Sequence, residues 1–578
     1  MKGLGKMMWA AAALALLVPG VAFAHGTPGH GAQGAAGGRV DKDSHGASGG
    51  DIATGMVYLD RNGNGVRDPG ERGIGGVSVS NGLDVVQTDA TGRYRISLPA
   101  ESILFISKPA EFEVPVNGDN LPQFYYIHYP DGTPPVADFE FPVIDPTGPL
   151  PAAIDFALLP GRKNVKAFRV MGFADPQART EEFQDQVRED IVNGLVDNPF
   201  GAVFGLVAGD VVDDNLDLYP RHIAMMGKIG IPLWNVPGNH DINFRAPDDR
   251  YSTQTYQRYF GPTDFSFNHG DVHFIGLDNV QYKGDGQGRY DNTIYRGYLS
   301  PQQLEWLRND LKYVPRDKLI VIMTHISLIT YALDGQGERF ALGDNINTVN
   351  FAELLEVLAP FQRVYAIAGH DTSNSWKVKV DHTHNWHGDW FIAHTLAEVR
   401  GNGWSSGPRD ERDVRWATMQ DGNPNGYYVM TFRGTEVQPR FIPAAGDPYR
   451  TMRIVLDPLL DGTRDPDGAV TAINRGRLQA GTKVVVNLFD GGERDLVELS
   501  IDGGEYVAMA NVLRNDPFMD RLRARFAGTP DGFSSPQPSS HIWEHPLPAL
   551  EPGLHVLRVR ALDEFGQASR DALTFELE

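Results

Sequence analysis

The stretch Val236-Pro237-Gly238-Asn239-His240-Asp241 follows a short apolar run, residues 231–235, that we predict to be a buried strand. Gly238 allows the backbone to turn sharply where the strand ends. The Asn239 side chain offers a neutral carbonyl oxygen to a cation, and His240 can donate a proton near neutral pH. Asp241, next in the chain, could orient the imidazole ring and raise its pKa. The alternative is an ordinary polar turn, so the rest of the chain decides between the two interpretations.

Other apolar runs in the middle of the chain also end in residue types that bind metals. We predict strands at residues 168–173, 202–208, 319–323 and 364–368, and they end at Asp175, Asp210, His325 and His370. Helical spacing separates them, at residues 181–195, 218–229, 301–313 and 351–358. Alternating strands and helices predict a layered α/β domain over residues 161–446. Because ligands bind at the carboxyl ends of the strands in such sheets, we expect these side chains to converge on one site.

The composition indicates a soluble protein of several domains. The chain has 578 residues, of which 41% are hydrophobic and 22% are charged. A formal net charge of -22 argues against a nucleic-acid platform and against binding to anionic membranes. The chain contains no cysteine, which rules out disulfides, thiolate metal ligands and thiol nucleophiles.

The N-terminus is typical of a secretory signal peptide, residues 1–24. Lys2 and Lys6 precede an apolar run at residues 9–18, and Ala22-Phe23-Ala24 forms a small-x-small cleavage site. The run is too short for a membrane span. We therefore predict an exported protein, periplasmic or secreted, without a membrane span. Residues 25–50 are rich in Gly, Ala and Ser and are predicted to be a flexible linker; a weak metal-binding tail is the alternative for their histidines.

Residues 60–71 fit the template of a calcium-binding loop. Gly65 takes the sixth position, where such loops turn. Oxygen-bearing side chains occupy positions one, three, five, nine and twelve, namely Asp60, Asn62, Asn64, Asp68 and Glu71. We predict that this loop binds Ca2+, the alternative being an unrelated polar turn. Predicted strands rather than helices flank the loop, and the segment resembles the calcium-binding B-type repeats of bacterial surface proteins. This resemblance implies an Ig-like β domain over residues 51–160.

The motif order "ADPQ … GDVVDD … GNHD … THIS … AGHD" resembles that of the calcineurin-like metallophosphoesterases. The resemblance implies a four-layered α/β/β/α sandwich with two divalent metals, Zn, Mn or Fe. It assigns Asp175 to the first metal, Asp210 to both, and Asn239, His325 and His370 to the second. It also implies that a metal-bound hydroxide attacks phosphorus. His240 would then be the general acid, paired with Asp241 or a nearby carboxylate, and Asp213 would support the site.

Two positions depart from the family pattern. Gln177 stands where the first motif normally has a histidine, and Thr372 replaces the second histidine of the last motif. Both losses affect the first metal, for which Gln177 is a possible weak, neutral ligand. Compensation by a downstream histidine is open, the candidates being His382, His384, His387 and His394. A site with a single metal is the alternative.

Residues 447–578 again have the pattern of strands, and we predict a C-terminal β-sandwich domain. Residues 553–561 alternate at period two, as expected for a half-buried strand. The segments "GWSSGPRDERDVRWATMQDGNPNGYYVM" and "HIWEHPLPALEPGLHVLRVRALDEFGQ" resemble those of a bacterial subgroup of the family with an extra β domain at each end. Gly403, Trp404 and Asn425 could line the pocket.

These observations predict an exported, metal-dependent phosphoester hydrolase, with monoesters and diesters both open as substrates. The alternative is a surface or periplasmic binding protein, or a structural protein, built on a degraded phosphoesterase core, because the first metal position has lost histidines. The sequence identifies no obvious arginine for binding the phosphate group, and Arg179 and Arg245, which follow motif loops, are candidates.

Overall fold

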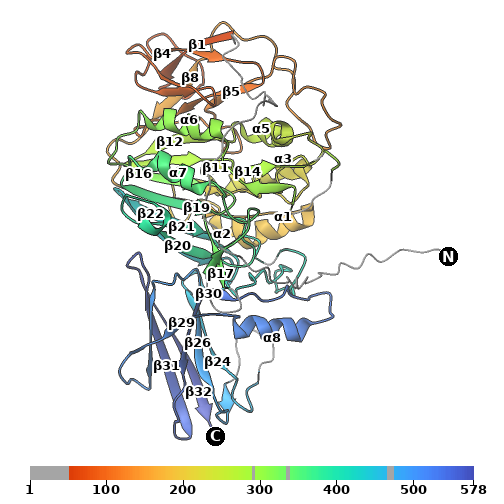
Figure 1. The fold of residues 1–578 in the computed structure, drawn as a ribbon, viewed down its shortest axis with the longest axis vertical. Coiled ribbons are helices and arrows are strands. Elements are labelled where there is room, and N and C mark those ends of the chain that lie inside the picture. The colour runs from red at the N-terminus through yellow and green to blue at the C-terminus, as the bar shows by residue number, and fades with distance from the viewer. Residues whose placement is uncertain (1–50, 285, 289–292, 334–338, 402, 465–473) are drawn as a thin grey trace, which may run out of the picture. The chain divides into compact units, whose positions relative to one another are not determined.

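The computed structural model describes residues 51–284, 286–288, 293–333, 339–401, 403–464 and 474–578 (Figure 1). The predicted signal peptide and the predicted linker, residues 1–24 and 25–50, lie outside the described residues. In the described part of the chain, no helix has the length and apolar composition needed to cross a membrane.

The N-terminal part forms two four-stranded sheets, with strand orders β4-β1-β8-β6 and β3-β2-β5-β7. The strands are β1 (Asp51–Leu59), β2 (Ser78–Ser80), β3 (Val85–Gln87), β4 (Arg93–Leu98), β5 (Ser102–Ser107), β6 (Phe112–Glu113), β7 (Tyr125–His128) and β8 (Phe156–Pro160). In β4 the buried residues Tyr94, Ile96 and Leu98 alternate with less buried ones, which gives the strand one apolar face. That face contributes to the core that the N-terminal part shares with the centre of the molecule.

Two sheets form the centre of the molecule. The five-stranded sheet has the order β11-β10-β9-β22-β23 and the six-stranded sheet the order β12-β13-β16-β19-β21-β20. The first consists of β9 (Ala167–Phe173), β10 (Phe204–Val207), β11 (Leu233–Asn235), β22 (Gly426–Arg433) and β23 (Glu436–Pro443). The second consists of β12 (Phe265–His269), β13 (Val272–Gly276), β16 (Leu319–Met323), β19 (Arg363–Ala368), β20 (Trp376–Val380) and β21 (Phe391–Thr395). Two hairpins lie outside these sheets, β14 (Val280–Tyr282) with β15 (Tyr295–Gly297) and β17 (Tyr331–Leu333) with β18 (Arg339–Ala341).

The central helices agree with the predicted ranges for the longer elements. They are α1 (Glu181–Val187), α2 (Asn193–Leu195), α3 (Tyr219–Met226), α4 (Asp249–Ser252), α5 (Gln254–Phe260), α6 (Pro301–Leu311) and α7 (Phe351–Leu358). A π-helical turn, Arg188–Val192, joins α1 to α2, and 3-10 turns lie at Leu216–Leu218, Gly227–Ile229 and His382–His384. Ser300 caps α6, because its side chain accepts a hydrogen bond from the Gln303 backbone N–H while the Gln303 side chain accepts one from Ser300 N–H.

Apolar side chains hold the helices against the sheets. Leu307 of α6 and Leu354 of α7 share a core with Ile320 of the six-stranded sheet. A separate core joins residues of α1 and α3 to the five-stranded sheet, as with Val187, Ile223 and Met171. The two sheets meet through aromatic rings: Trp234 of β11 stacks on Phe267 of β12 with ring centroids 4.1 Å apart.

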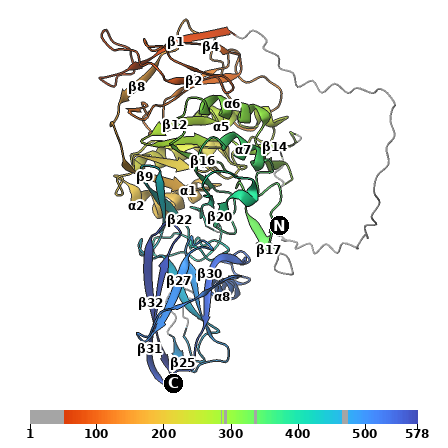
Figure 2. The same cartoon turned by 60° about the vertical axis from the view of Figure 1, so that its left-hand side comes forward.

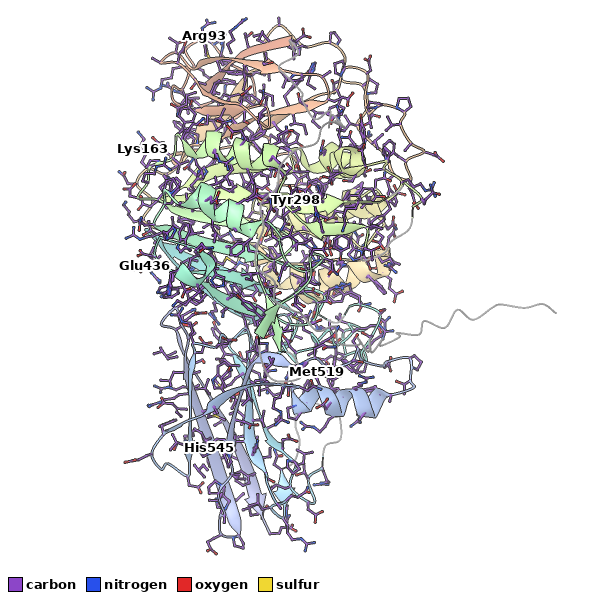
Figure 3. All side chains as sticks on the ribbon, viewed as in Figure 1. Arg93, Lys163, Tyr298, Glu436, Met519 and His545 are labelled. Carbon is purple, nitrogen blue, oxygen red and sulfur yellow. The ribbon has the colours of Figure 1, made fainter. Side chains whose placement is uncertain are left out.

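The C-terminal part forms a four-stranded sheet, β24-β26-β30-β29, and a five-stranded sheet, β25-β32-β31-β27-β28 (Figure 2). The strands are β24 (Met452–Asp457), β25 (Arg475–Gly476), β26 (Lys483–Leu488), β27 (Leu496–Ile501), β28 (Val507–Ala508), β29 (Ala510–Arg514), β30 (Ser539–Pro546), β31 (Gly553–Leu562) and β32 (Ala568–Leu577). The predicted alternation in β31 is confirmed, since Leu557, Val559 and Ala561 are buried and the residues between them are exposed. The helix α8 (Pro517–Phe526) was not predicted; its residue Met519, labelled in Figure 3, is fully buried.

Buried polar contacts join the outer parts to the centre. On the N-terminal side, the Trp306 indole N–H of α6 donates to Ser80 Oγ at 3.0 Å. On the C-terminal side, the Asp490 carboxylate accepts hydrogen bonds from Tyr428 at 2.7 Å and pairs with His394 at 2.8 Å. All these residues belong to one contact unit, Gly49–Glu578.

Candidate metal centre

The predicted metal-binding residues follow the carboxyl ends of strands, on loops with unusual backbone conformations. Asp175, Asp210 and His370 have φ angles of 49°, 49° and 76°, in the left-handed region that non-glycine residues rarely occupy. A Cβ atom on Gly238 would lie 2.1 Å from Asp210 Oδ1, and one on Gly369 would lie 2.2 Å from Asp175 Oδ2. Only glycine fits at these two positions, and the loops therefore approach the carboxylates closely.

The loops bring five of the predicted ligands together. Ligand atoms of Asp175, Asp210 and His325 all lie within 4.8 Å of one another. His325 Nε2 lies 2.9 Å from Asn239 Oδ1, 3.1 Å from His370 Nδ1 and 3.3 Å from Asp210 Oδ1. All five residues are buried. The expected convergence of five strand ends on one point is therefore what the structure has.

The two histidines of this cluster are oriented to offer a lone pair to it. His325 Nδ1 lies 2.8 Å from the Ala208 carbonyl oxygen, and His370 Nε2 lies 2.7 Å from the Asn345 carbonyl oxygen. Each ring can donate its N–H to that outer carbonyl and point its other nitrogen inward, as metal-binding histidines do. Burial lowers the pKa of His370 to about 4 and that of His325 well below its ordinary value, so both rings are neutral.

The two carboxylates carry a charge that the protein alone does not balance. Burial, followed by the charge of Asp210, raises the pKa of Asp175 well above its ordinary value. Burial also raises the pKa of Asp210 to about 8, with a further contribution from Asp241. Positive charge placed between the carboxylates would offset this repulsion and keep both ionised.

Gln177 supplies a second sign that a cation belongs here. Its side-chain oxygen Oε1 is buried and has no hydrogen-bond partner among the described residues, and an unpaired buried acceptor costs free energy. The backbone holds Gln177 beside the cluster, since its N–H donates to the Asp210 carbonyl oxygen at 3.0 Å. Carboxylate, amide and neutral imidazole donors without sulfur suit Zn, Mn or Fe. The residues present thus fit the divalent metals that the family pattern implies.

His240 lies beside this cluster and is held by two acids. Its Nδ1 atom is 2.6 Å from Asp214 Oδ1 and 3.1 Å from Asp213 Oδ1, and its Nε2 atom is 4.0 Å from Asp210 Oδ2. Although burial lowers the pKa of His240, the charges of Asp210, Asp213 and Asp214 raise it to about 10. The imidazole therefore lies at the edge of the cluster with Asp213 and Asp214 as its partners.

Of the two partners expected for His240, Asp241 or a nearby carboxylate, the structure has the nearby carboxylates Asp213 and Asp214, and Asp241 as the partner is wrong. The Asp241 carboxylate accepts backbone N–H bonds from Gly238 at 2.9 Å and Val211 at 3.0 Å, and a hydroxyl bond from Tyr219 at 2.9 Å. Neighbouring residues on this loop point to opposite sides, so Asp241 ties two ligand loops together while Asp214 holds the imidazole.

Of the predicted phosphate-binding arginines, one lies near the centre. The Arg179 Nη2 atom pairs with Asp213 at 2.9 Å and Asp214 at 3.0 Å. Arg245 instead pairs with Glu140 at 3.5 Å, and its side chain is 44% exposed. Sequence reasoning missed Arg400, whose charge lowers the pKa values of both Asp175 and Asp210.

The downstream histidines do not rebuild the first metal position. His394 uses both ring nitrogens elsewhere, on Tyr365 and Asp490. His384 Nε2 bonds to the Tyr331 hydroxyl at 2.8 Å. Among the described residues, the groups of acids and histidines that could hold a metal do not include His382 or His387.

The aromatic and amide residues suggested as pocket lining are buried in the loops behind the ligands. Trp404 donates its indole N–H to the Pro176 carbonyl oxygen at 3.0 Å, and Asn425 donates to Asp190 Oδ2 at 2.7 Å. Trp404 therefore supports the loop that carries Asp175 and Gln177.

The predicted calcium loop forms a turn stabilised by its own side chains. The buried Asp60 accepts the Gly63 and Gly65 N–H groups through its two oxygens, at 2.7 and 2.8 Å. The amides of Asn62 and Asn64 meet Asp68 Oδ2 at 2.7 and 3.0 Å. The Glu71 carboxylate accepts the Arg61 and Asp68 N–H groups at 2.8 and 3.0 Å. Asn62 and Asn64 thus meet Asp68 through amide N–H groups, while their side-chain oxygens accept the backbone N–H groups of Asn64 and Val66. Asp60 and Glu71 fix the backbone around them.

Family models match three consecutive parts of the chain. The model for calcineurin-like phosphoesterase matches residues 168–372, and models for the N-terminal and C-terminal parts of calcineurin-like phosphoesterase match residues 61–142 and 394–568. The fold and the buried Asp, Asn and His cluster define a protein of the metallophosphoesterase class. The chain belongs to the calcineurin-like phosphoesterases.

Two curated proteins are similar to parts of the chain. One is the 3',5'-cyclic adenosine monophosphate phosphodiesterase CpdA of Haemophilus influenzae, 30% identical over 179 residues, which are 30% of this chain and 56% of that protein. The other is the uncharacterized protein YvnB of Bacillus subtilis, 27% identical over 153 residues, which are 24% of this chain and 10% of that protein. The matches therefore span about half and a tenth of these relatives. Among solved structures, the purple acid phosphatase PPD1 from yellow lupin (Lupinus luteus) seeds aligns with 66% of this chain and 70% of its own, at 13% identity and a TM-score of 0.35.

Proposed function

We propose that this protein is a metal-dependent phosphoester hydrolase. The observation that carries the proposal is the placement of His240 beside the buried cluster of Asp175, Asp210, Asn239, His325 and His370. A cluster that only stabilised the fold would have no use for a protonatable imidazole held by two acids at its edge.

The donor set divides between two metal positions. Asp175, Gln177 and Asp210 would hold the first, and Asp210, Asn239, His325 and His370 the second. Divalent cations bound there would polarise the phosphoryl group and activate water for in-line displacement. The first position has the weaker donor set. Gln177, a neutral amide, stands in place of one histidine of the family pattern, and Thr372 stands in place of another.

His240 is the general acid in this proposal. Asp214 and Asp213 both face Nδ1, so these acids fix the ring and keep it protonated, while Nε2 points to the side of Asp210. Nε2 can then give its proton to the oxygen of the leaving group as the bond to phosphorus breaks. Such proton transfer contributes about 10²–10⁴-fold to a rate.

The substrate is a phosphoester, and both ester classes are candidates. The similarity to a cyclic nucleotide phosphodiesterase supports trying diesters, and monoesters are the second set to be tested. Purified mature protein loaded with Zn, Mn or Fe should hydrolyse aryl phosphate esters. Asp210→Asn should abolish this turnover and keep the thermal unfolding temperature close to that of the wild type. Turnover by this variant at the wild-type rate would refute the site.

A binding protein built on a degraded phosphoesterase core is the second candidate function. One observation favours it: none of the four downstream histidines completes the first metal position among the described residues. His394 bonds to Asp490 instead, and His384 bonds to Tyr331. Elemental analysis separates the candidates. Two transition metals per chain, or one with turnover, support the hydrolase. No transition metal after incubation with each of the three ions supports the binding protein.

Two further assignments complete the proposal. The loop from Asp60 to Glu71 would bind Ca2+, which the spacing of its oxygen-bearing side chains supports. Export to the periplasm or the medium rests on residues 1–24 of the sequence, and N-terminal sequencing of the mature protein tests it by the expected start at His25.

A further inference from the structure

Arg400 is fixed to the segment that carries the first predicted metal ligand. It follows β21, and its backbone N–H donates to the Asp175 carbonyl oxygen at 3.2 Å. The preceding residue, Val399, donates to the Ala174 carbonyl oxygen at 2.8 Å. Two consecutive backbone bonds therefore set the position of the Arg400 Cα relative to the cluster, whatever its side chain does.

The Arg400 side chain is anchored at one point only. Its Nε donates to Glu398 Oε2 at 3.2 Å, and Glu398 is fully buried. Among the described residues, the two terminal amino groups of Arg400 have no hydrogen-bond partner, and 19% of the side chain is exposed. The Nη1 and Nη2 groups of the guanidinium are thus available to a ligand, while the bond from Nε to Glu398 holds the side chain in place.

The charge of this fork acts on the whole cluster. It lowers the pKa values of Asp175, Asp210 and Asp213. Burial lowers the pKa of Arg400 itself, but the charges of Glu398, Asp213, Asp175 and Asp210 raise it above the ordinary value. Arg179, the other arginine at the centre, has its Nη2 engaged by Asp213 and Asp214. Arg400 is therefore the better placed of the two for an incoming anion.

We propose that Arg400 binds the non-bridging phosphoryl oxygens of the substrate and of the phosphate product, with Glu398 as its positioning residue. A planar guanidinium presents paired N–H donors that match phosphate oxygens, and such charge-assisted pairs are strong. The attraction scales with the charge of the ligand, so Arg400 favours a dianionic phosphomonoester over a monoanionic diester. This inference rests on the proposed function, and it assigns phosphomonoesters as the preferred substrate class of the proposed hydrolase.

Titration of metal-loaded protein with inorganic phosphate tests the binding role directly. Arg400→Gln should weaken phosphate affinity at least about tenfold, and Arg400→Lys should weaken it less, because lysine keeps the charge but loses the fork. Arg409→Gln removes an arginine that pairs with Glu182 and Asp413 rather than with a residue of the cluster, and should bind phosphate like the wild type. Unchanged affinity in Arg400→Gln would overturn the proposal.

A double variant separates binding from folding. Arg400→Gln alone leaves the buried Glu398 without its partner, which could destabilise the protein. Glu398→Gln combined with Arg400→Gln removes both charges, so the wild-type unfolding temperature should be largely kept while phosphate affinity still falls. Wild-type phosphate affinity in this folded double variant would overturn the proposal as well.

Paired substrates test the preference for dianions. For Arg400→Gln, kcat/KM should fall more with p-nitrophenyl phosphate than with ethyl p-nitrophenyl phosphate, mostly through KM. An equal or larger loss with the diester would overturn the preference. Turnover by Asp210→Asn at the wild-type rate would refute the proposed function, whereas the phosphate titration judges Arg400 without any turnover.

Discussion

The Nδ1 atom of His240 lies 2.6 Å from Oδ1 of Asp214, at a position 26 residues earlier in the chain. This contact fixes which ring nitrogen faces the acids and which faces Asp210. His240 and Asp214 lie on different loops, so the pair forms only when the loops after β10 and β11 are folded together.

His240→Gln should lower kcat by about 10²–10⁴-fold, because it removes the proton given to the leaving oxygen. The loss should be larger with phenyl phosphate than with p-nitrophenyl phosphate, whose better leaving group depends less on protonation. Steady-state kinetics with the two esters measures this. Equal losses with both esters would show that His240 acts in another way.

Asp214→Asn should lower kcat in the same direction by a smaller factor, since Asp213 still faces Nδ1 at 3.1 Å. Its unfolding temperature should stay near that of the wild type. Asp241→Asn is the matched control: an amide cannot accept all the bonds that this buried carboxylate receives, so the unfolding temperature should fall. The reverse pattern, with Asp241→Asn stable and slow, would restore Asp241 as the partner of His240.

Gln177→His should strengthen metal binding at the first position, and Gln177→Leu should weaken it. The reason is that Gln177 Oε1 is a buried acceptor without a partner in the described part of the chain, whereas imidazole is the stronger ligand for the same ions. Metal content after dialysis against increasing chelator checks both variants. We expect the ion of the first position to survive longest in Gln177→His and to be lost first in Gln177→Leu. Identical curves for all three proteins would exclude Gln177 as a ligand.

The strand–helix order and the ligands at the strand ends could be predicted from the sequence, because both are local patterns. Apolar runs such as residues 319–323 became β16, and the Ser300-Pro301 start of α6 was visible as a cap. The motif glycines could be read as turns from the sequence, and the structure has a left-handed backbone at Asp175, Asp210 and His370 in these same loops.

The partners of the site could not be predicted, because they depend on which way a loop residue points. Asp241 is adjacent to His240 in sequence yet faces the Gly238 and Val211 N–H groups, while Asp214 comes from another loop. Arg400 lies far along the chain from Asp175, and only the backbone bond between them reveals its position. The short apolar pattern of α8 was likewise hidden, since only part of that helix is buried.

Ca2+ should raise the unfolding temperature of the full-length protein, because a cation held by side-chain oxygens of the loop from Asp60 to Glu71 favours the folded loop. At a free concentration of about 100 Kd, the stabilisation would be about 2.7 kcal/mol. Differential scanning calorimetry with Ca2+, Mg2+ or chelator measures the shift. Asp68→Ala should abolish it, and hydrolysis should be little affected. An equal shift in Asp68→Ala would place the calcium elsewhere.

Glu564, a buried residue outside the candidate metal centre, should make the free energy of unfolding depend on pH. Its side chain is 2% exposed, and neither carboxylate oxygen has a hydrogen-bond partner among the residues that the structure describes. Arg494 pairs with it at 3.6 Å. Burial raises the pKa of Glu564 to about 7, although Lys377 lowers it. The protonated form is therefore favoured in the folded protein. Its contribution to stability is complete below the unfolded pKa of 4.5 and is lost as the pH rises to about 7.

Glu564→Gln should remove this loss, because the amide keeps the shape of the side chain without a charge to bury. The free energy of unfolding of the variant should exceed that of the wild type by about 3 kcal/mol at pH 8, and the two should converge near pH 4.5. Denaturant titrations across this pH range measure the difference. Glu576→Gln, which changes a partly exposed glutamate of β32, is the control and should follow the wild type at every pH. If the free energy of unfolding of Glu564→Gln runs parallel to that of the wild type across the pH range, Lys377 and Arg494 already keep Glu564 ionised. The burial of Glu564 would then be balanced by these two cations and would not cost stability.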